Sequence, residues 1–509
     1  MAPKKRKASQ AAAEPEAPAP KRGKAAAAAP STKKATVKTT PRGKPKGKAA
    51  AASDSKPAAS SSSSAASTIA PISIPGASDE VISLVKEKCR LPDKSGVALF
   101  SGATCWDEVG RSKDSNVVSP YCLLSAHRVD ALKDLRFRHI ASGTAACHTI
   151  LVTEDGTPYV WGRNDRGQCG AAASSCWSVP RLLPGFQKIK VRQAACGRGH
   201  TLVLTESGLV FAFGDNKAGQ LGLGHQNIVT KPSHVSTESE FPMVKVACGV
   251  EHSAMIDSSG SLFTFGCPEY GQLGNNTDGK YFITASKMSF HYVTRPARVP
   301  VFVEKDPKEG TKIIDSVCIV DVACGNNHTV VVNDKKKVFT FGFGGYGRLG
   351  HAGTANELVP RLLPQFGWRA GLGVEQIACG STFSMAISEN GQIYFWGQQK
   401  MTGEATMYPL AMPDFYGWKA RSLGCCYKSV IAVADESVIA WGSSPTFGEL
   451  GFGPAGNKTS AKPKIVDPLD KIYVHTATGG YGHVIYLARD DTDTDKEEIA
   501  KLPEFECPE

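Results

Sequence analysis

The stretch HTLVLTESGLVFAFG, residues 200–214, decides the fold of this 509-residue chain. Two short apolar runs flank the turn Glu206-Ser207-Gly208, and a second glycine, Gly214, closes the stretch. Alternating apolar runs of this length are typical of β-strands, and a glycine between them supplies the positive φ angle that a tight turn requires. Residues 200–214 therefore predict a β-hairpin.

The hairpin belongs to a unit that repeats along the chain. The unit starts with a small residue, Cys and Gly, and two further residues follow. The His that begins the hairpin comes next, with Ser or Thr after it. Seven copies of this phrase, some degenerate, begin at Ala141, Ala195, Ala247, Ala323, Ala378, Gly424 and Thr478. A second phrase, an apolar run ending in Gly and then Gly-Gln-Leu-Gly, follows most copies. Its first glycines are Gly162, Gly214, Gly266, Gly342, Gly397 and Gly442, spaced by 45–60 residues except for one gap of 76.

Two hairpins fit in each repeat, which predicts a four-stranded blade, and seven such repeats predict an all-β, seven-bladed β-propeller. The copy at Thr478 has the first phrase and lacks the second. The segment from Val97 to Trp106 has the second phrase and lacks the first. We therefore expect the N-terminal strand to complete the last blade and close the ring.

Charge divides the chain into three parts. Residues 1–60 hold 15 Lys and Arg against three acidic residues, whereas residues 488–509 hold nine acidic residues against three basic ones. The body between them is nearly neutral, which excludes a uniformly basic, histone-like protein, and its apolar content excludes a wholly disordered chain. We predict a disordered basic arm over 1–92, in which 81–91 form a short helix or strand, a propeller over 93–489 and an acidic tail over 490–509.

The arm carries the candidate localisation and nucleic-acid residues. Lys4, Lys5, Arg6 and Lys7 form a basic cluster typical of a nuclear localisation signal. The stretch 41–45 resembles an AT-hook core, with Lys44 in place of the second arginine. The alternative that we favour is sequence-independent phosphate binding by the arm. The candidate residues for it are Lys21, Arg22, Arg42, Lys44, Lys46 and Lys48.

Membrane, metal and disulfide chemistry find little support in the sequence. No apolar run approaches the roughly 18–20 residues that span a bilayer, and the basic N-terminus lacks the apolar stretch of a secretory signal, so we expect an intracellular protein.

No CxxC pair or HExxH motif occurs. Five of the 15 cysteines recur at one repeat position, which indicates small buried hydrophobes rather than disulfides or metal ligands.

Motifs that invite a catalytic interpretation have simpler explanations. Residues 342–347 match GxGxxG, but no helix is expected after them to bind a pyrophosphate. The repeat histidines are expected to be structural, each hydrogen-bonding turns of its own blade. They are His148, His200, His252, His328 and His483. No nucleophile–base pattern stands out, so we predict no catalytic residues, cofactor, metal or small-molecule substrate.

The Ala-Cys-Gly-x-x-His-Ser/Thr and Gly-Gln-Leu-Gly phrases resemble the regulator-of-chromosome-condensation (RCC) repeat propeller family, from about Val97 to Pro503. This resemblance implies a nuclear, chromosome-associated protein of mitosis that binds small GTPases. We predict an interaction scaffold whose propeller binds proteins and whose arm binds chromatin, DNA or the acidic surface of microtubules.

The alternative that the resemblance implies is an active guanine-nucleotide exchange factor. In the family's founding member the exchange surface includes acidic and His residues just before the repeat His. Among the corresponding positions here, Gly199, Glu251, Asn327, Thr382, Lys428 and Gly482, only Glu251 is acidic. Glu251 is thus the candidate GTPase contact, and an ordinary exposed turn residue is the other interpretation.

The gap of 76 residues marks an insertion at about 275–318. It combines seven Lys and Arg residues with five aromatic ones. A long loop on a rigid scaffold is a common place for a binding site. The two alternatives are a protruding hairpin that contacts a partner and a longer outer strand pair. The tail from Asp490 to Glu509 is too acidic for a core, so we expect a solvated regulatory or protein-contact segment.

Overall fold

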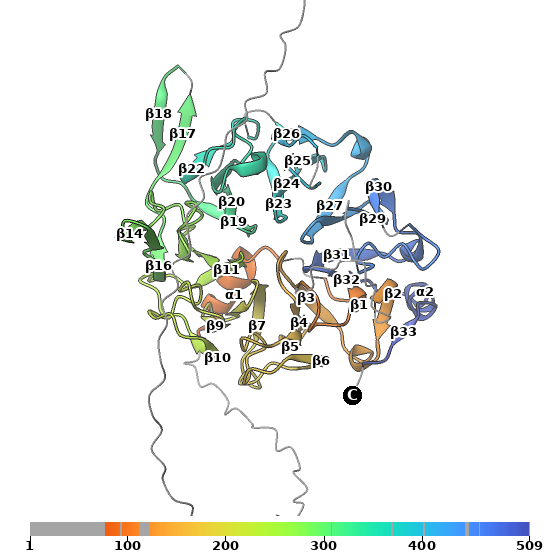
Figure 1. Ribbon diagram of the computed structural model, residues 1–509. Helices are drawn as coiled ribbons and strands as arrows, with labels where there is room; N and C mark the ends of the chain where they lie inside the picture. Colours follow the sequence, from red (N-terminus) through yellow and green to blue (C-terminus); the bar gives the residue numbers. More distant parts are fainter. Residues whose placement is uncertain are drawn as a thin grey trace, which may run out of the picture. The chain divides into compact units, whose positions relative to one another are not determined.

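The computed structural model describes residues 77–91, 94–110, 122–306, 308–367, 370–400, 403–442, 447–457 and 459–507, all within one compact unit that spans 66–509. Seven sheets stand around a common centre, with the first strand of each repeat innermost (Figure 1). The predicted seven-bladed β-propeller is therefore confirmed. The basic residues singled out between Lys4 and Lys48 lie outside the described residues.

Each blade is an antiparallel sheet. Blade 1 contains β3 (Phe137–Ala141), β4 (His148–Thr153), β5 (Pro158–Arg163) and β6 (Cys176–Leu182). Blade 2 contains β7 (Val191–Cys196), β8 (His200–Thr205), β9 (Val210–Gly214) and β10 (Val229–His234). Blade 3 contains β11 (Met243–Cys248), β12 (His252–Asp257), β13 (Leu262–Gly266) and β16 (Val293–Arg298). The hairpin predicted over 200–214 is formed by β8 and β9, in which His200 pairs with Gly214.

The remaining blades follow the same plan. Blade 4 contains β19 (Ile319–Cys324), β20 (His328–Asn333), β21 (Val338–Gly342) and β22 (Glu357–Leu362). Blade 5 contains β23 (Val374–Cys379), β24 (Phe383–Ser388), β25 (Ile393–Gly397) and β26 (Thr406–Ala411). Blade 6 contains β27 (Ala420–Cys425), β28 (Ser429–Ala434), β29 (Ser437–Gly442) and β30 (Ser460–Ile465). Short 3-10 turns lie at Asp130–Leu132, Gly345–Gly347, Pro413–Phe415 and Asp467–Leu469.

Blade 7 is built from both ends of the chain. Its inner strands are β31 (Val474–Gly479) and β32 (His483–Ala488), and its outer strands are β1 (Val97–Ala103) and β2 (Cys122–Val129). β1 pairs with β32 over six residues, from Val97 opposite Ala488 to Gly102 opposite His483. The predicted closure of the ring by the N-terminal strand is confirmed.

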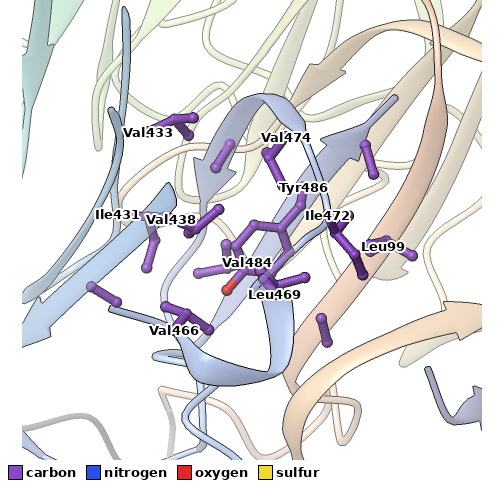
Figure 2. Close-up of a cluster of buried hydrophobic side chains, with 14 of the residues drawn as sticks. Leu99, Ile431, Val433, Val438, Val466, Leu469, Ile472, Val474, Val484 and Tyr486 are labelled. Atoms are coloured by element: carbon purple, nitrogen blue, oxygen red, sulfur yellow. The ribbon is translucent and has the colours of Figure 1, made fainter. Parts of the chain in front are cut away.

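Apolar side chains fill the space between neighbouring blades. Between blades 6 and 7 the core joins Ile431, Val438 and Val484 to Tyr486 and to Leu99 of the closing strand (Figure 2). All five side chains are buried. Because β1 contributes Leu99 to this core, closure of the ring also completes a hydrophobic interface.

The outer strands are protected against pairing with other chains. In blades 1 to 6 each outer strand contains a proline, which has no N–H to donate at an exposed edge. These prolines are Pro180, Pro232, Pro296, Pro360, Pro409 and Pro463. The outer strand of blade 7, β2, has no proline, and β33 (Glu504–Phe505) pairs with it in parallel instead.

The predicted boundary of the arm at residue 92 is too late. Residues Asp79–Lys88 form a helix, α1, whose N-cap Ser78 accepts a hydrogen bond from the Val81 N–H. Val85 is buried against apolar residues of blades 3 and 4, and Cys89 is buried against blades 2 and 3. The apolar side chains of 81–91 therefore lie on the propeller rather than in a solvated arm.

The expectation of a tail too acidic for a core is also wrong for most of its length. Residues Asp493–Ala500 form α2, which begins with a capping box between Thr492 and Asp495. Asp495 also receives two hydrogen bonds of 2.9 Å from Arg489. With these charges partnered, Ile499 and Leu502 pack into the core of blades 6 and 7. The segment is part of the closed ring.

The insertion forms two hairpins, one separate from the blades and one that extends an outer strand. The first hairpin, β14 (Lys280–Thr284) and β15 (Lys287–Phe290), is a separate two-stranded sheet. The second hairpin, β17 (Phe302–Asp306) and β18 (Gly310–Ile314), extends blade 4, because Val303 of β17 pairs with Arg361 of β22. It projects from the rim of the ring (Figure 1).

Candidate interaction face

The repeat histidines join each blade to the next one. The Nε2 atom of His200 in blade 2 lies 3.0 Å from the Ser253 hydroxyl of blade 3, and that hydroxyl donates to the carbonyl of Gln220 in blade 2. The same arrangement links His148 to Thr201, His252 to Thr329 and His328 to Ser384, and His483 contacts Thr149 across the closure. The predicted structural role fits this geometry, but the predicted partner within the same blade is wrong.

This geometry explains why the two sequence phrases repeat together. The first phrase supplies the His and the Ser or Thr, and the second supplies, in Gln168, Gln220 and Gln272, the carbonyl that accepts from the hydroxyl. Since the hydroxyl hydrogens of Thr201, Ser253, Thr329 and Ser384 are directed to carbonyls, the Nε2–H of the histidine that each one contacts must be the donor. Burial lowers the pKa of His148, His200 and His483 to about 3 and that of His252 to about 4, so the rings are neutral.

The glycine of the first phrase makes room for the histidine ring. A Cβ atom on Gly197 would lie 2.1 Å from Cε1 of His200, and the Gly197 N–H donates to the His200 carbonyl. Blade 5 places Phe383 against Gly380 in the same way. In blade 6 the small Ser429 stands in the place of the ring, and there Cys426 replaces the glycine. The cysteine of the phrase is buried and unpaired in each of blades 2 to 6.

The two residues between this glycine and the histidine form the gap loops, at 198–199, 250–251, 326–327, 381–382, 427–428 and 481–482. We call the surface that they share the gap face. A cavity of about 660 Å³ opens there, and its lining includes Gly199, Glu251 and Asn327. Sequence analysis singled out all three positions. Thr382, Lys428 and Gly482 do not line the cavity.

Charges of both signs line this cavity. Its basic residues are Arg163, Arg166, Arg198 and Lys217, and its acidic residues are Asp165, Asp215 and Glu251. Loss of water contact raises the pKa of Glu251, Arg198 opposes that increase, and Asp215 and Glu269 add to it. A mixed, partly desolvated set of charges of this kind suits the recognition of a complementary protein surface.

Aromatic side chains surround the charged cavity. Tyr427 and Tyr481 line it, with ring centroids 4.6 Å apart. Farther out, Arg348 lies over the ring of Phe343 at 4.6 Å, and Tyr346 is exposed. Aromatic side chains are enriched among the residues that contribute most to protein–protein binding, and Tyr346 is accessible for such a contact, whereas Arg348 is buried. These residues were not predicted from the sequence. Tyr427 and Tyr481 are the first residues of their gap loops, whereas only the second position of each loop was considered.

The first insertion hairpin leaves blade 3 at the gap face. β13 ends at Gly266, which pairs with His252 on one side and with Val293, the first residue of β16, on the other. Residues 267–292 therefore emerge beside the gap loop that carries Glu251. Phe282 and Met288 form a cross-strand pair in the hairpin, and their side chains are 69% and 44% exposed. These exposed apolar side chains extend the gap face.

Within the part of the chain that the structure describes, no three His, Cys, Asp or Glu side chains form a group that could hold a metal ion. Neither α1 nor α2 is long and apolar enough to cross a bilayer. The residues 342–347 that match GxGxxG form the end of β21 and a single 3-10 turn.

Comparison with known proteins gives one consistent match. Residues 98–486 match the family model described as the RCC1-like domain. The chain is 44% identical to Protein RCC2 of Homo sapiens over 85% of its length and 83% of that protein, and 44% identical to the Protein RCC2 homolog of Danio rerio over 83% and 86%. Yeast RCC1 (Prp20) bound to Kap60 shares the fold, with a TM-score of 0.65 and 18% identity over 84% of this chain and 97% of that chain.

Proposed function

The chain belongs to the RCC1-like domain family, and from this we propose that it is a non-catalytic scaffold that binds small GTPases and other proteins through the gap face. The family membership predicted from the sequence is confirmed. A protein-binding role follows from that membership. The choice of face and partner is the part that we propose.

The observation that carries the proposal is the combination of features on one face. A cavity of about 660 Å³ is lined by the tilted pair Tyr427 and Tyr481, and the hairpin that carries the exposed Phe282–Met288 pair leaves blade 3 beside the Glu251 gap loop. A rigid propeller presents such a surface without reorganisation on binding, which favours tight and specific contacts.

A small GTPase is the partner that the relatives favour. The yeast propeller Prp20p, at 18% identity and a TM-score of 0.62, is described together with its binding properties to Gsp1p and histones. In this chain we propose that Glu251 and the first insertion hairpin contact the GTPase. Guanine-nucleotide exchange is the second candidate function, and the position of the Glu251 carboxylate in the cavity is the observation that favours it.

The basic arm supplies the second half of the proposed function. Residues 1–60 carry 15 Lys and Arg residues against three acidic ones. We propose that Lys4, Lys5, Arg6 and Lys7 direct nuclear import. The arm would then hold the propeller on chromatin during mitosis, or on microtubules, through phosphate or carboxylate contacts that weaken with salt. The proposal requires that binding to DNA disappear when residues 1–76 are removed.

The hairpin gives a direct test of the gap face. In the double variant Phe282→Ser/Met288→Ser we expect binding to a small GTPase to weaken at least about tenfold, because truncation of a central apolar contact costs about 2 kcal/mol or more. The measurement is affinity by biolayer interferometry, with the full chain against a panel of small GTPases in nucleotide-free, GDP-bound and GTP-bound forms.

A matched control exists in the second hairpin. Ile313 on β18 is 65% exposed, so Ile313→Ser removes a comparable apolar side chain away from the gap face. It should leave GTPase affinity unchanged. Equal affinities for wild type and the double variant would exclude the hairpin from the interface, and a panel without any binding partner would overturn the assignment to small GTPases.

A further inference from the structure

At the end of the central channel opposite the gap face, polar side chains from all seven blades form a ring. The third residue of each innermost strand points into a cavity of about 920 Å³ at this mouth, which we call the helix mouth because α1 packs beside it. The seven residues of this ring are His139, Gln193, Lys245, Asp321, Gln376, Ser422 and Thr476. Below them the channel is lined by the small residues Ala141, Ala195, Ala247, Ala323, Ala378 and Thr478.

The ring side chains are engaged with one another across the blades. Lys245 forms an ion pair of 2.9 Å with Asp321, and the Ser422 and Thr476 hydroxyls lie 2.8 Å apart. Gln193 and Gln376 each accept a hydrogen bond from a backbone N–H of the next blade, Val246 and Leu423 respectively. These contacts satisfy hydrogen-bonding groups of the ring. The charge that the cavity presents to a ligand therefore depends on the residues around its rim.

The rim differs between the part that α1 covers and the part that remains open. The second residue of the innermost strand is Val244 in blade 3, where α1 packs, and Arg192 in blade 2, which donates to the Lys86 carbonyl of α1. In blades 1, 5, 6 and 7 the same position holds Arg138, Glu375, Arg421 and His475, which line the cavity. These four residues form the open part of the rim.

Cations without an acidic partner predominate on the open rim. Glu375 and Glu389 both pair with Lys336, and Arg138 pairs with Glu206. Within the described part of the chain, no ion pair forms to Arg90, Lys419 or Arg421, which line the cavity, or to Lys94 in the adjoining one. Asp435 and Glu436 also act electrostatically on Arg421, and neither forms an ion pair with it.

Arg421 is the most strongly held of these cations. Its guanidinium lies over the ring of Tyr473 at 4.1 Å and donates to the Val474 carbonyl at 3.0 Å, and Arg489 lies over the same ring. Burial lowers the pKa of Arg421. A partly desolvated guanidinium in a fixed position, with no carboxylate bound, is prepared for an anionic ligand.

We propose that the helix mouth binds an acidic peptide segment of a partner protein, with its carboxylates on Arg421, Lys419 and Lys94. The volume lies within the range of ligand-binding cavities and suits a short chain segment. The fixed carboxylates of Glu375, Glu389 and Asp321 would repel a continuous phosphate backbone, whereas a peptide can present its acids to the cations alone. The chain that precedes α1 is strongly basic, so it adds attraction for an acidic partner.

The test uses the full chain and a dye-labelled peptide of alternating Glu and Gly, with binding measured by fluorescence anisotropy at about 0.15 M salt. Lys94→Gln/Lys419→Gln removes two exposed charges at the rim and should weaken binding about tenfold. Arg421→Gln should weaken it similarly, provided that thermal unfolding shows a folded protein. The control is Lys231→Gln/Lys462→Gln, which removes two exposed charges from the outer strands β10 and β30 and should leave binding unchanged.

Equal affinity of wild type and the Lys94→Gln/Lys419→Gln variant would overturn the proposal, since binding would then reside elsewhere on the chain. An equal loss in the Lys231→Gln/Lys462→Gln control would do the same, because net charge alone would explain it. Competition with inositol hexakisphosphate tests whether the site prefers the carboxylates of a peptide or a polyphosphate. Displacement of the peptide only at a large excess agrees with a peptide site, whereas tighter binding of the polyphosphate contradicts it.

Discussion

A chain that begins at residue 105 is expected not to fold into a propeller. It lacks β1, which lies between β32 and β2 in blade 7 and carries the buried side chains of Leu99 and Phe100. Phe100 also packs on Trp106 and on His483, so its loss reaches the last histidine of the ring. Burial of each large apolar side chain contributes about 1.5–3 kcal/mol, and the strand's hydrogen bonds on both sides are lost as well. The total is comparable to the whole stability of a typical domain.

A series of N-terminal deletions separates closure from the other contributions. Removal of residues 1–76 should leave urea unfolding of the propeller unchanged. Removal of 1–92 also takes away α1, with Val85 and Cys89, and should lower the free energy of unfolding by about 2–4 kcal/mol. Removal of 1–104 should abolish the cooperative transition. The same unfolding midpoint for the chains that begin at 93 and at 105 would refute closure by β1.

Acid is expected to unfold the propeller near pH 5 because of the histidines between blades. Burial lowers the pKa of His148, His200 and His483 to about 3 and that of His252 to about 4, whereas an unfolded histidine titrates near 6.5. The unfolded chain therefore binds more protons between these values, and stability is lost as the pH falls below about 6.5. At pH 5 each of the four contributes a loss of about 2 kcal/mol, or about 8 kcal/mol in all.

Blade 5 supplies the variant that tests this cause. Phe383 occupies the histidine position there and packs on Gly380, so His200→Phe has a precedent in the same fold. The variant loses the bond to Ser253, which should cost about 1 kcal/mol at pH 7.5. It also removes one titrating group, so by pH 5 it should be as stable as the wild type or more so. Parallel stability curves for the two proteins between pH 7.5 and 5 would show that His200 is not responsible.

The architecture was predictable because the repeats are local in sequence. The phrase around Cys196, Gly197 and His200 marks the blades, and the missing second phrase after Thr478 predicts the closing strand. The partner of His200 was not predictable in the same way. Four of the five repeat histidines have a hydroxyl next to them in the sequence, Thr201 in this case, and only the packing of blades shows that Ser253 of the next blade is the partner of His200.

The terminal segments of the chain that pack on the propeller were harder to predict. They are rich in polar residues, and a few specific contacts decide whether they pack. The acids of 490–509 suggested a solvated tail, yet Asp495 binds Arg489 and caps α2, which allows Ile499 and Leu502 to pack. The candidate site was predicted only in part. The position of Glu251 follows from the repeat, whereas the cavity around it combines residues of several blades that are distant in sequence.

The central claim is that the gap face binds a small GTPase without catalysing exchange on it. The most direct measurement is the release of fluorescent GDP from the GTPase that binds, with and without the full chain. The account predicts binding with an unchanged release rate, for the wild type and for Glu251→Ala alike. Accelerated release by the wild type that disappears in Glu251→Ala would contradict it and establish an exchange factor.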